Sequence, residues 1–87
     1  MALFMAKVLI YTTQNCSYCR AAKDLLKARG IEFTEVLVES DQQWDEMIAR
    51  SGMKTVPQIF YNERLIGGFT DLVSLDKKNG LSSLSGT

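Results

Sequence analysis

The 87-residue sequence predicts an α/β fold, a four-stranded mixed sheet flanked by helices in the order β-α-β-α-β-β-α. Short apolar runs alternate with amphipathic segments in the first half, which is typical of β-α-β units with parallel strands. Two further apolar runs around a two-residue turn signal predict a hairpin. Because a chain of this length has room for one core, we expect a single domain over residues 1–87, with residues 1–6 as an extension and 85–87 as a tail.

The first half of the chain supplies a strand, a helix and a second strand. Residues 7–12 are apolar and rich in β-favouring side chains, so they predict a buried strand. Apolar side chains recur at helical spacing in residues 17–29, and Gly30 is typical of the position after a helix. Residues 31–38 predict the second strand. Because a helix links these two strands, they should be parallel.

The second half supplies a helix, a hairpin and a last helix. We expect the helix over residues 42–50, with Ser40 or Asp41 as its N-cap. All the predicted strands are nearly continuous apolar runs, which is typical of a sheet covered on both faces. The later elements are strands at 57–61 and 64–67 around an Asn-Glu turn, and a helix at 71–78 before a Ser-rich tail.

Composition and charge exclude several classes of function. Ten basic residues balance ten acidic ones, so nothing predicts the basic field of a nucleic-acid-binding protein. No apolar run approaches the roughly 18 residues of a membrane span, and residues 1–7 do not resemble a signal peptide. We therefore expect a cytoplasmic monomer with neither nucleic-acid nor membrane partners. The sequence has no histidine, the commonest general base and metal ligand.

The two cysteines, Cys16 and Cys19, form a C-x-x-C pair. A disulfide between them closes a very short loop and is a poor staple, so the pair indicates redox chemistry or a metal site. Cys16 falls at or near the N-cap of the first helix, where unpaired N–H groups and the helix dipole stabilise a thiolate. We therefore predict that Cys16 is the nucleophile and Cys19 the resolving thiol. A C-x-x-C pair beside a β-α-β unit is typical of thioredoxin-like redox proteins.

Four motifs follow one another along the chain. They are Tyr11-Thr12 before Cys16-Ser17-Tyr18-Cys19, then Thr55-Val56-Pro57, then Gly67-Gly68 with Phe69-Thr70-Asp71, and finally residues 75–84. In this order and spacing, the chain resembles the small bacterial glutaredoxins over about residues 7–84. The resemblance implies a thioredoxin-like fold, a cis peptide bond before Pro57, and glutathione-dependent thiol–disulfide exchange with glutathionylated or disulfide-bonded proteins.

The resemblance also implies that glutathione, the co-substrate, binds beside the cysteine pair. The backbone of Val56 would pair with its cysteinyl part, and Thr70 with Asp71 would hold its γ-glutamyl group. Simpler roles stay open: Asp71 as a helix cap, Pro57 as the opening of a strand, and Tyr18 as a surface aromatic. The implied glutathione-binding residues are Thr13, Tyr18, Thr55, Val56, Pro57, Gly68, Phe69, Thr70 and Asp71.

The chain departs from the family pattern at three positions. Ser17 stands where the family usually has proline, and Thr13 stands where it often has a lysine that reaches the glycine carboxylate of glutathione. Trp44 falls about where an Arg or Gln often contacts the same carboxylate. Gln43 or Lys54 could substitute in part, so we expect glutathione to bind more weakly.

Three rival functions stay open. A thioredoxin-like donor would be reduced by a flavoprotein, although the turn at residues 67–71 favours glutathione. A [2Fe–2S] carrier would hold its cluster between two monomers through Cys16 and glutathione, which the resemblance allows because Ser17 is small. A zinc module would need the four thiolates of a dimer, because two cysteines without histidine cannot complete a tetrahedral site.

Overall fold

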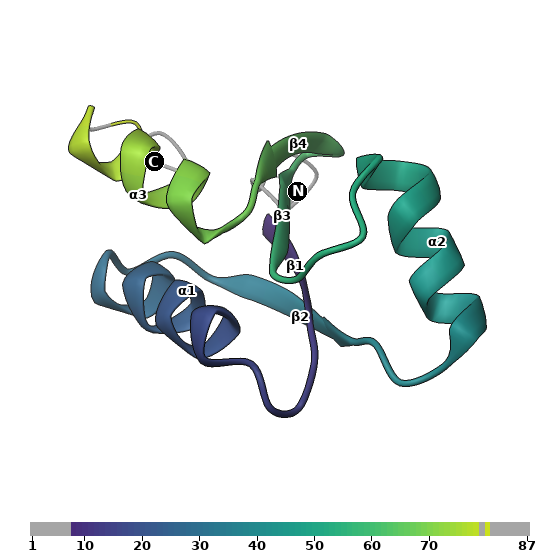
Figure 1. Ribbon diagram of the computed structural model, residues 1–87. Helices are drawn as coiled ribbons and strands as arrows, with labels where there is room; N and C mark the ends of the chain where they lie inside the picture. Colours follow the sequence, from purple (N-terminus) through teal and green to yellow (C-terminus); the bar gives the residue numbers. More distant parts are fainter. Residues whose placement is uncertain (1–7, 79, 81–87) are drawn as a thin grey trace, which may run out of the picture.

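The computed structural model describes residues 8–78 and 80, and there the chain follows the predicted order of strands and helices (Figure 1). The fold class is therefore confirmed, whereas the predictions for residues 1–6 and 85–87 lie outside the described residues. The single-domain organisation stays a prediction. The elements are β1 (Val8–Thr12), α1 (Ser17–Ala28), β2 (Phe33–Leu37), α2 (Asp41–Ser51), β3 (Gln58–Tyr61), β4 (Arg64–Gly67) and α3 (Phe69–Lys77).

The four strands form one mixed sheet in the order β2-β1-β3-β4. Strand β1 runs parallel to β2 and antiparallel to β3, and β3 pairs with β4 as the predicted hairpin. Beyond the strands, the Val38 N–H donates to the Thr12 carbonyl with an N···O distance of 2.8 Å. The end of β1 is therefore held directly before the loop that leads to Cys16.

Two cores lie on opposite faces of the sheet, as a sheet with helices on both sides requires. Helices α1 and α3 cover one face and α2 covers the other (Figure 1). On the first face, Ala22 and Leu26 of α1 and Leu72 of α3 are buried against the strands. Met47 of α2 is buried against the second face. The apolar faces predicted for α1 and α2 thus point at the sheet.

The prediction that all the strands are covered on both faces is wrong for the two edge strands. In β2, Thr34 and Glu35 are exposed, and in β4, Arg64 and Leu65 are exposed. An edge strand has a neighbouring strand on one side only, and each helix layer leaves part of it in contact with solvent. Full coverage therefore applies to the central strands β1 and β3.

Two helix starts refine the predicted boundaries. Ser40, not Asp41, is the N-cap of α2, and Gln43 completes a capping box by accepting from the Ser40 N–H at 3.1 Å. Helix α3 begins at Phe69, two residues before the predicted start, because extended Gly68 is its N-cap. Within residues 8–78, none of the helices combines the length and apolar character needed to cross a bilayer.

The turn between β3 and β4 places two non-glycine residues in the left-handed region. Asn62 has a φ of 49° and Glu63 a φ of 70°, the pattern of a type I′ hairpin turn. Asparagine tolerates this region, whereas glutamate is strained there. We expect Glu63→Gly to raise the free energy of unfolding by about 1 kcal/mol, measured by urea denaturation. Glu63→Ala removes the same side chain without relieving the backbone, so an equal gain from alanine would contradict this account.

Candidate active site

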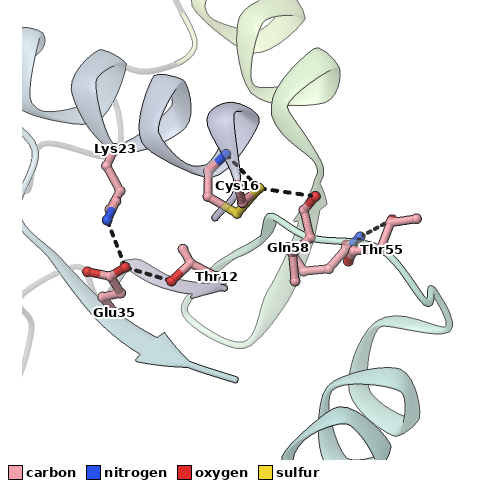
Figure 2. Close-up of a disulfide and its surroundings, with 8 residues drawn as sticks. Thr12, Cys16, Lys23, Glu35, Thr55 and Gln58 are labelled. Atoms are coloured by element: carbon pink, nitrogen blue, oxygen red, sulfur yellow. Dashed lines mark hydrogen bonds and ion pairs between the residues drawn. A yellow bond between two sulfur atoms is a disulfide. The ribbon is translucent and has the colours of Figure 1, made fainter. Parts of the chain in front are cut away.

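The cysteine pair lies at the start of α1. Cys16 is the N-cap residue, with extended backbone angles, and its Sγ accepts from the Cys19 N–H at an N···S distance of 3.1 Å. The two cysteines form a disulfide across a Cα–Cα distance of 5.2 Å (Figure 2). Cys16 is half-buried, whereas only 1% of Cys19 is exposed. The predicted placement at the helix start and the predicted bridging distance are both confirmed.

The start of α1 is well suited to a thiolate at Cys16 once the disulfide is reduced. The first turn of α1 carries no acidic side chain that would oppose a negative charge. The Cys19 N–H, which already points at the Cys16 Sγ, is one of the donors that a helix start leaves without an intrahelical acceptor. A hydrogen bond and the positive end of the helix dipole both favour the thiolate over the thiol.

A groove of about 150 Å³ is built from three segments that are far apart in the sequence. The first turn of α1, the loop before β3 and the start of α3 each contribute. The Val56 carbonyl oxygen lies 3.9 Å from the Cys16 Sγ, so the groove opens beside this sulfur. The Val56–Pro57 peptide bond is cis, as the resemblance implied. The lining residues are Tyr18, Thr55, Val56, Pro57, Gly68, Phe69 and Thr70.

Two aromatic rings form one wall of this groove. Tyr18 is 64% exposed, and its ring centroid lies 5.8 Å from that of Phe69. Phe69 itself packs against the core beneath α1 and α3. Phe69 therefore links the exposed Tyr18 ring to the core beside the cysteine pair.

Asp71 caps the start of α3. Its Oδ2 accepts from the Gly68 N–H at 3.0 Å, which is the helix-capping role considered from the sequence. Gly67 approaches this carboxylate with a φ of 124°, so a side chain at that position would strike Asp71. The proposed contact between Asp71 and a γ-glutamyl group stays a prediction.

Thr13 lies apart from the groove. It lines a separate hollow with Gln14, Asn15, Val38 and Glu39, between the loops that follow β1 and β2. Its contact with glutathione stays a prediction, and it is not among the residues that line the groove.

The two proposed substitutes also differ in position. The Gln43 side-chain oxygen is occupied in the α2 capping box. Lys54 is exposed and directly precedes Thr55, and it forms no ion pair with any residue in the described part of the chain. Of the two, Lys54 is the better candidate, because it is a cation and lies next to the groove-lining Thr55.

Sequence reasoning missed a polar cluster that joins β1, β2 and α1 (Figure 2). The buried Thr12 hydroxyl donates to Glu35 Oε2 at 2.6 Å, and Lys23 Nζ donates to the same oxygen at 2.8 Å. The hydrogen bond from Lys23, and after it the one from Thr12, lowers the pKa of Glu35 below its usual value. The available signal was Glu35, a charged residue inside an otherwise apolar strand, together with Lys23, a lysine one turn after Cys19.

This cluster predicts a stability difference that depends on pH. The lowered pKa of Glu35 means that its carboxylate stabilises the fold above the ordinary glutamate pKa, and this contribution is lost as the pH falls through the lowered value. Solvent screening of the partly exposed pair limits the effect to about 0.5–1 kcal/mol. We expect Glu35→Gln to lower the free energy of unfolding at pH 7 and to match the wild type in strong acid. Urea denaturation at several pH values measures this.

The control for this prediction is Glu46→Gln. Glu46 is exposed on α2 and has no ion pair among the residues that the structure describes. A pH-dependent loss of equal size in both variants would show that net charge, not the contacts of Glu35, causes the effect.

Comparison with known proteins agrees with the fold and with the cysteine pair. The glutaredoxin family model matches residues 8–66. Glutaredoxin 3 of Escherichia coli K12 is 47% identical over 81 residues, which covers 92% of this chain and 98% of that protein.

Two solved structures are also similar. The solution structure of glutaredoxin from Brucella melitensis has a TM-score of 0.83 and 41% identity, covering 97% of this chain and 92% of that one. The crystal structure of the holo form of glutaredoxin C1 from Populus tremula x tremuloides has a TM-score of 0.81 and 30% identity, covering 88% and 80%. The chain therefore belongs to the glutaredoxin family and is a glutathione-dependent thiol–disulfide oxidoreductase.

Proposed function

We propose that the Cys16 thiolate attacks the glutathione sulfur of a protein–glutathione mixed disulfide. A sulfur–sulfur bond forms between Cys16 and glutathione, and the protein thiolate leaves. A second glutathione thiolate then attacks the glutathione sulfur bound to Cys16, which releases oxidised glutathione and restores the Cys16 thiolate. The observation that carries this proposal is the half-buried Cys16 Sγ at the N-cap of α1, 3.9 Å from the Val56 carbonyl in the groove wall.

Cys19 supports a second route for disulfide-bonded proteins. After Cys16 has formed a mixed disulfide with such a protein, the Cys19 thiolate attacks Cys16 Sγ and releases the protein thiolate. The product is the Cys16–Cys19 disulfide, whose geometry the fold accommodates. Because Cys19 is buried, it reacts with a sulfur already on Cys16 in preference to an outside disulfide. Two glutathione molecules then reduce the pair.

The groove is the proposed glutathione site. Its length runs from Thr55 and Val56, beside the sulfur, to Thr70 at the start of α3. An extended peptide can pair with the Val56 backbone, as a strand adds to a sheet edge. The first N–H groups of α3, at Phe69 and Thr70, have no intrahelical acceptor and suit a carboxylate. We assign the γ-glutamyl carboxylate to this end, with Asp71 near its ammonium group.

The substrates that we propose are glutathionylated and disulfide-bonded proteins. We place the protein in the cytoplasm, because a dithiol that glutathione must reduce works where the glutathione pool is reducing. We propose that it works as a monomer, because one chain supplies both cysteines and all the segments that line the groove.

A [2Fe–2S] cluster does not fit the donor set of one chain. Such a cluster needs four ligands, and within residues 8–78 and 80 no three His, Cys, Asp or Glu side chains gather to hold a metal. Cys16 is the accessible thiol, and Cys19 is buried. A cluster would therefore require a second copy and outside thiolates. Visible absorption after anaerobic reconstitution with iron and sulfide tests this alternative.

The test of the main proposal is a coupled assay with glutathione, glutathione reductase and a small glutathione mixed disulfide. We expect turnover that depends on glutathione. It is measured as the oxidation of the NADPH that glutathione reductase consumes. A parallel assay replaces glutathione and its reductase with a flavoprotein thioredoxin reductase. Turnover in the second assay alone would overturn the proposal in favour of a thioredoxin-like donor.

A further inference from the structure

Gln58 lies beneath the groove, and its side chain is hydrogen-bonded to Thr55, one of the residues that line it. It is the first residue of β3, directly after Pro57, and only 1% of it is exposed. Its Nε2 donates to the Thr55 carbonyl oxygen at 3.0 Å and to Thr55 Oγ1 at 3.1 Å (Figure 2). Both hydrogens of the amide nitrogen are therefore engaged by one residue of the groove.

The orientation of this amide is determined by its partners. A backbone carbonyl oxygen can only accept, so the nitrogen of the Gln58 amide must face Thr55. The Gln58 Oε1 is then buried, and it has no hydrogen-bond partner among the described residues. A buried acceptor without a partner costs free energy, and an apolar side chain of the same length would avoid that cost. Stability alone therefore does not explain a glutamine at this position.

The bonds to Thr55 have a consequence inside the groove. Thr55 is exposed and lines the groove, and the next residue, Val56, has its carbonyl oxygen 3.9 Å from Cys16 Sγ. Because Thr55 Oγ1 accepts from Gln58, its own hydrogen points away from Gln58 and is available to donate. Lys54, an exposed cation, directly precedes it. A hydroxyl donor beside a cation suits an anionic group of the ligand.

We propose that Gln58 is a positioning residue for the glutathione site. From beneath the groove it orients the Thr55 hydroxyl as a donor to a carboxylate of bound glutathione, and it holds Val56 beside Cys16. Gln58 does not touch the ligand and acts through Thr55. This inference rests on the proposed glutathione groove.

The test uses Gln58→Met, which keeps the length of the side chain and removes both donors. A glutathionylated peptide is the substrate, with glutathione and glutathione reductase in excess. We expect KM for the peptide to rise about 3-fold, because the Thr55 hydroxyl keeps its hydrogen but loses the partner that orients it, and kcat to change less than two-fold. The urea midpoint should equal or exceed that of the wild type, because the unpaired Oε1 is gone.

Two further variants complete the test. Thr55→Val removes the hydroxyl at an exposed position, and we expect a larger rise in KM of about 10-fold, as for the loss of a hydrogen bond to a charged group. Because Gln58 acts through this hydroxyl, the double variant should have a KM close to that of the worse single variant. Gln42→Met, on the exposed first turn of α2, is the matched control and should leave KM and kcat unchanged.

The outcomes separate this inference from the proposed function. An unchanged KM in Gln58→Met, with normal activity in the wild type, overturns the inference. A variant that is less stable, with a lower kcat together with the higher KM, would also overturn it, because that result means a structural role only. If Gln58→Met does not fold, an unchanged KM in Thr55→Val overturns it. An absence of glutathione-linked turnover in the wild type would instead contradict the proposed function.

Discussion

Cys16→Ser is expected to lower exchange activity by at least about 1,000-fold with both classes of substrate, because the other thiol, Cys19, is buried and cannot reach an outside disulfide. The hydroxyl of serine stays protonated at neutral pH, and the helix start that stabilises a thiolate cannot compensate for that. The measurement is glutathione-coupled turnover of a glutathionylated peptide and of a disulfide-bonded protein. The fold should be unaffected, because Cys16 is half-buried at a helix N-cap where serine is also favoured.

Cys19→Ser is the matched variant within the same pair. It should retain most turnover of the glutathionylated peptide, because a second glutathione completes that route. It should lose reduction of the disulfide-bonded protein, because that route needs the buried resolving thiol. An equal loss of both activities would contradict the route through glutathione, and residual turnover in Cys16→Ser would refute the nucleophile assignment.

Gly67→Ala is expected to destabilise the fold strongly. Gly67 has a φ of 124°, and an added Cβ would lie 2.7 Å from Cγ of Asp71. Either the backbone of residue 67 would have to adopt a different φ, or the Asp71 side chain would have to move and lose its hydrogen bond from the Gly68 N–H. We expect the free energy of unfolding to fall by about 2–3 kcal/mol, measured by urea denaturation. The start of α3 would also shift, so KM for the glutathionylated peptide should rise.

Gly52→Ala is the control for this clash. Gly52 also has a positive φ, 74°, but its added Cβ would meet no atom within 4 Å. Its cost should therefore be about 1 kcal/mol, the strain of the backbone alone. The double variant Gly67→Ala and Asp71→Ala should recover part of the loss, because the carboxylate is removed. Equal losses at Gly67 and Gly52 would show that the approach of Asp71 has no effect.

Local patterns in the sequence predicted most of the fold and the reactive pair. Apolar periodicity and turn residues place strands and helices because each depends on neighbours within a few positions. The same holds for Cys16, since a helix start is marked by the residues around it. The start of α3 was misplaced by two residues because the extended conformation of Gly68 and its bond to Asp71 are not visible in a composition pattern.

The rest was decided by the tertiary structure. The groove joins Tyr18, Thr55 and Thr70 from three segments, and Thr13 faces a different hollow although it is only three residues from Cys16. Packing of the helices against the sheet, not sequence spacing, brings such residues together or separates them.

The hydrogen-bond partners of polar side chains inside the fold were likewise not predicted from the sequence. The charge of Glu35 on an edge strand is stabilised by Lys23 and Thr12, which come from another helix and another strand. The bonds from buried Gln58 to Thr55 span only three residues, yet no sequence pattern marked them. The sequence by itself therefore determined the order of elements and the position of the cysteine pair at a helix start. Only the tertiary structure decided which side chains share a hydrogen bond, because hydrogen bonds depend on distances that the packed fold sets.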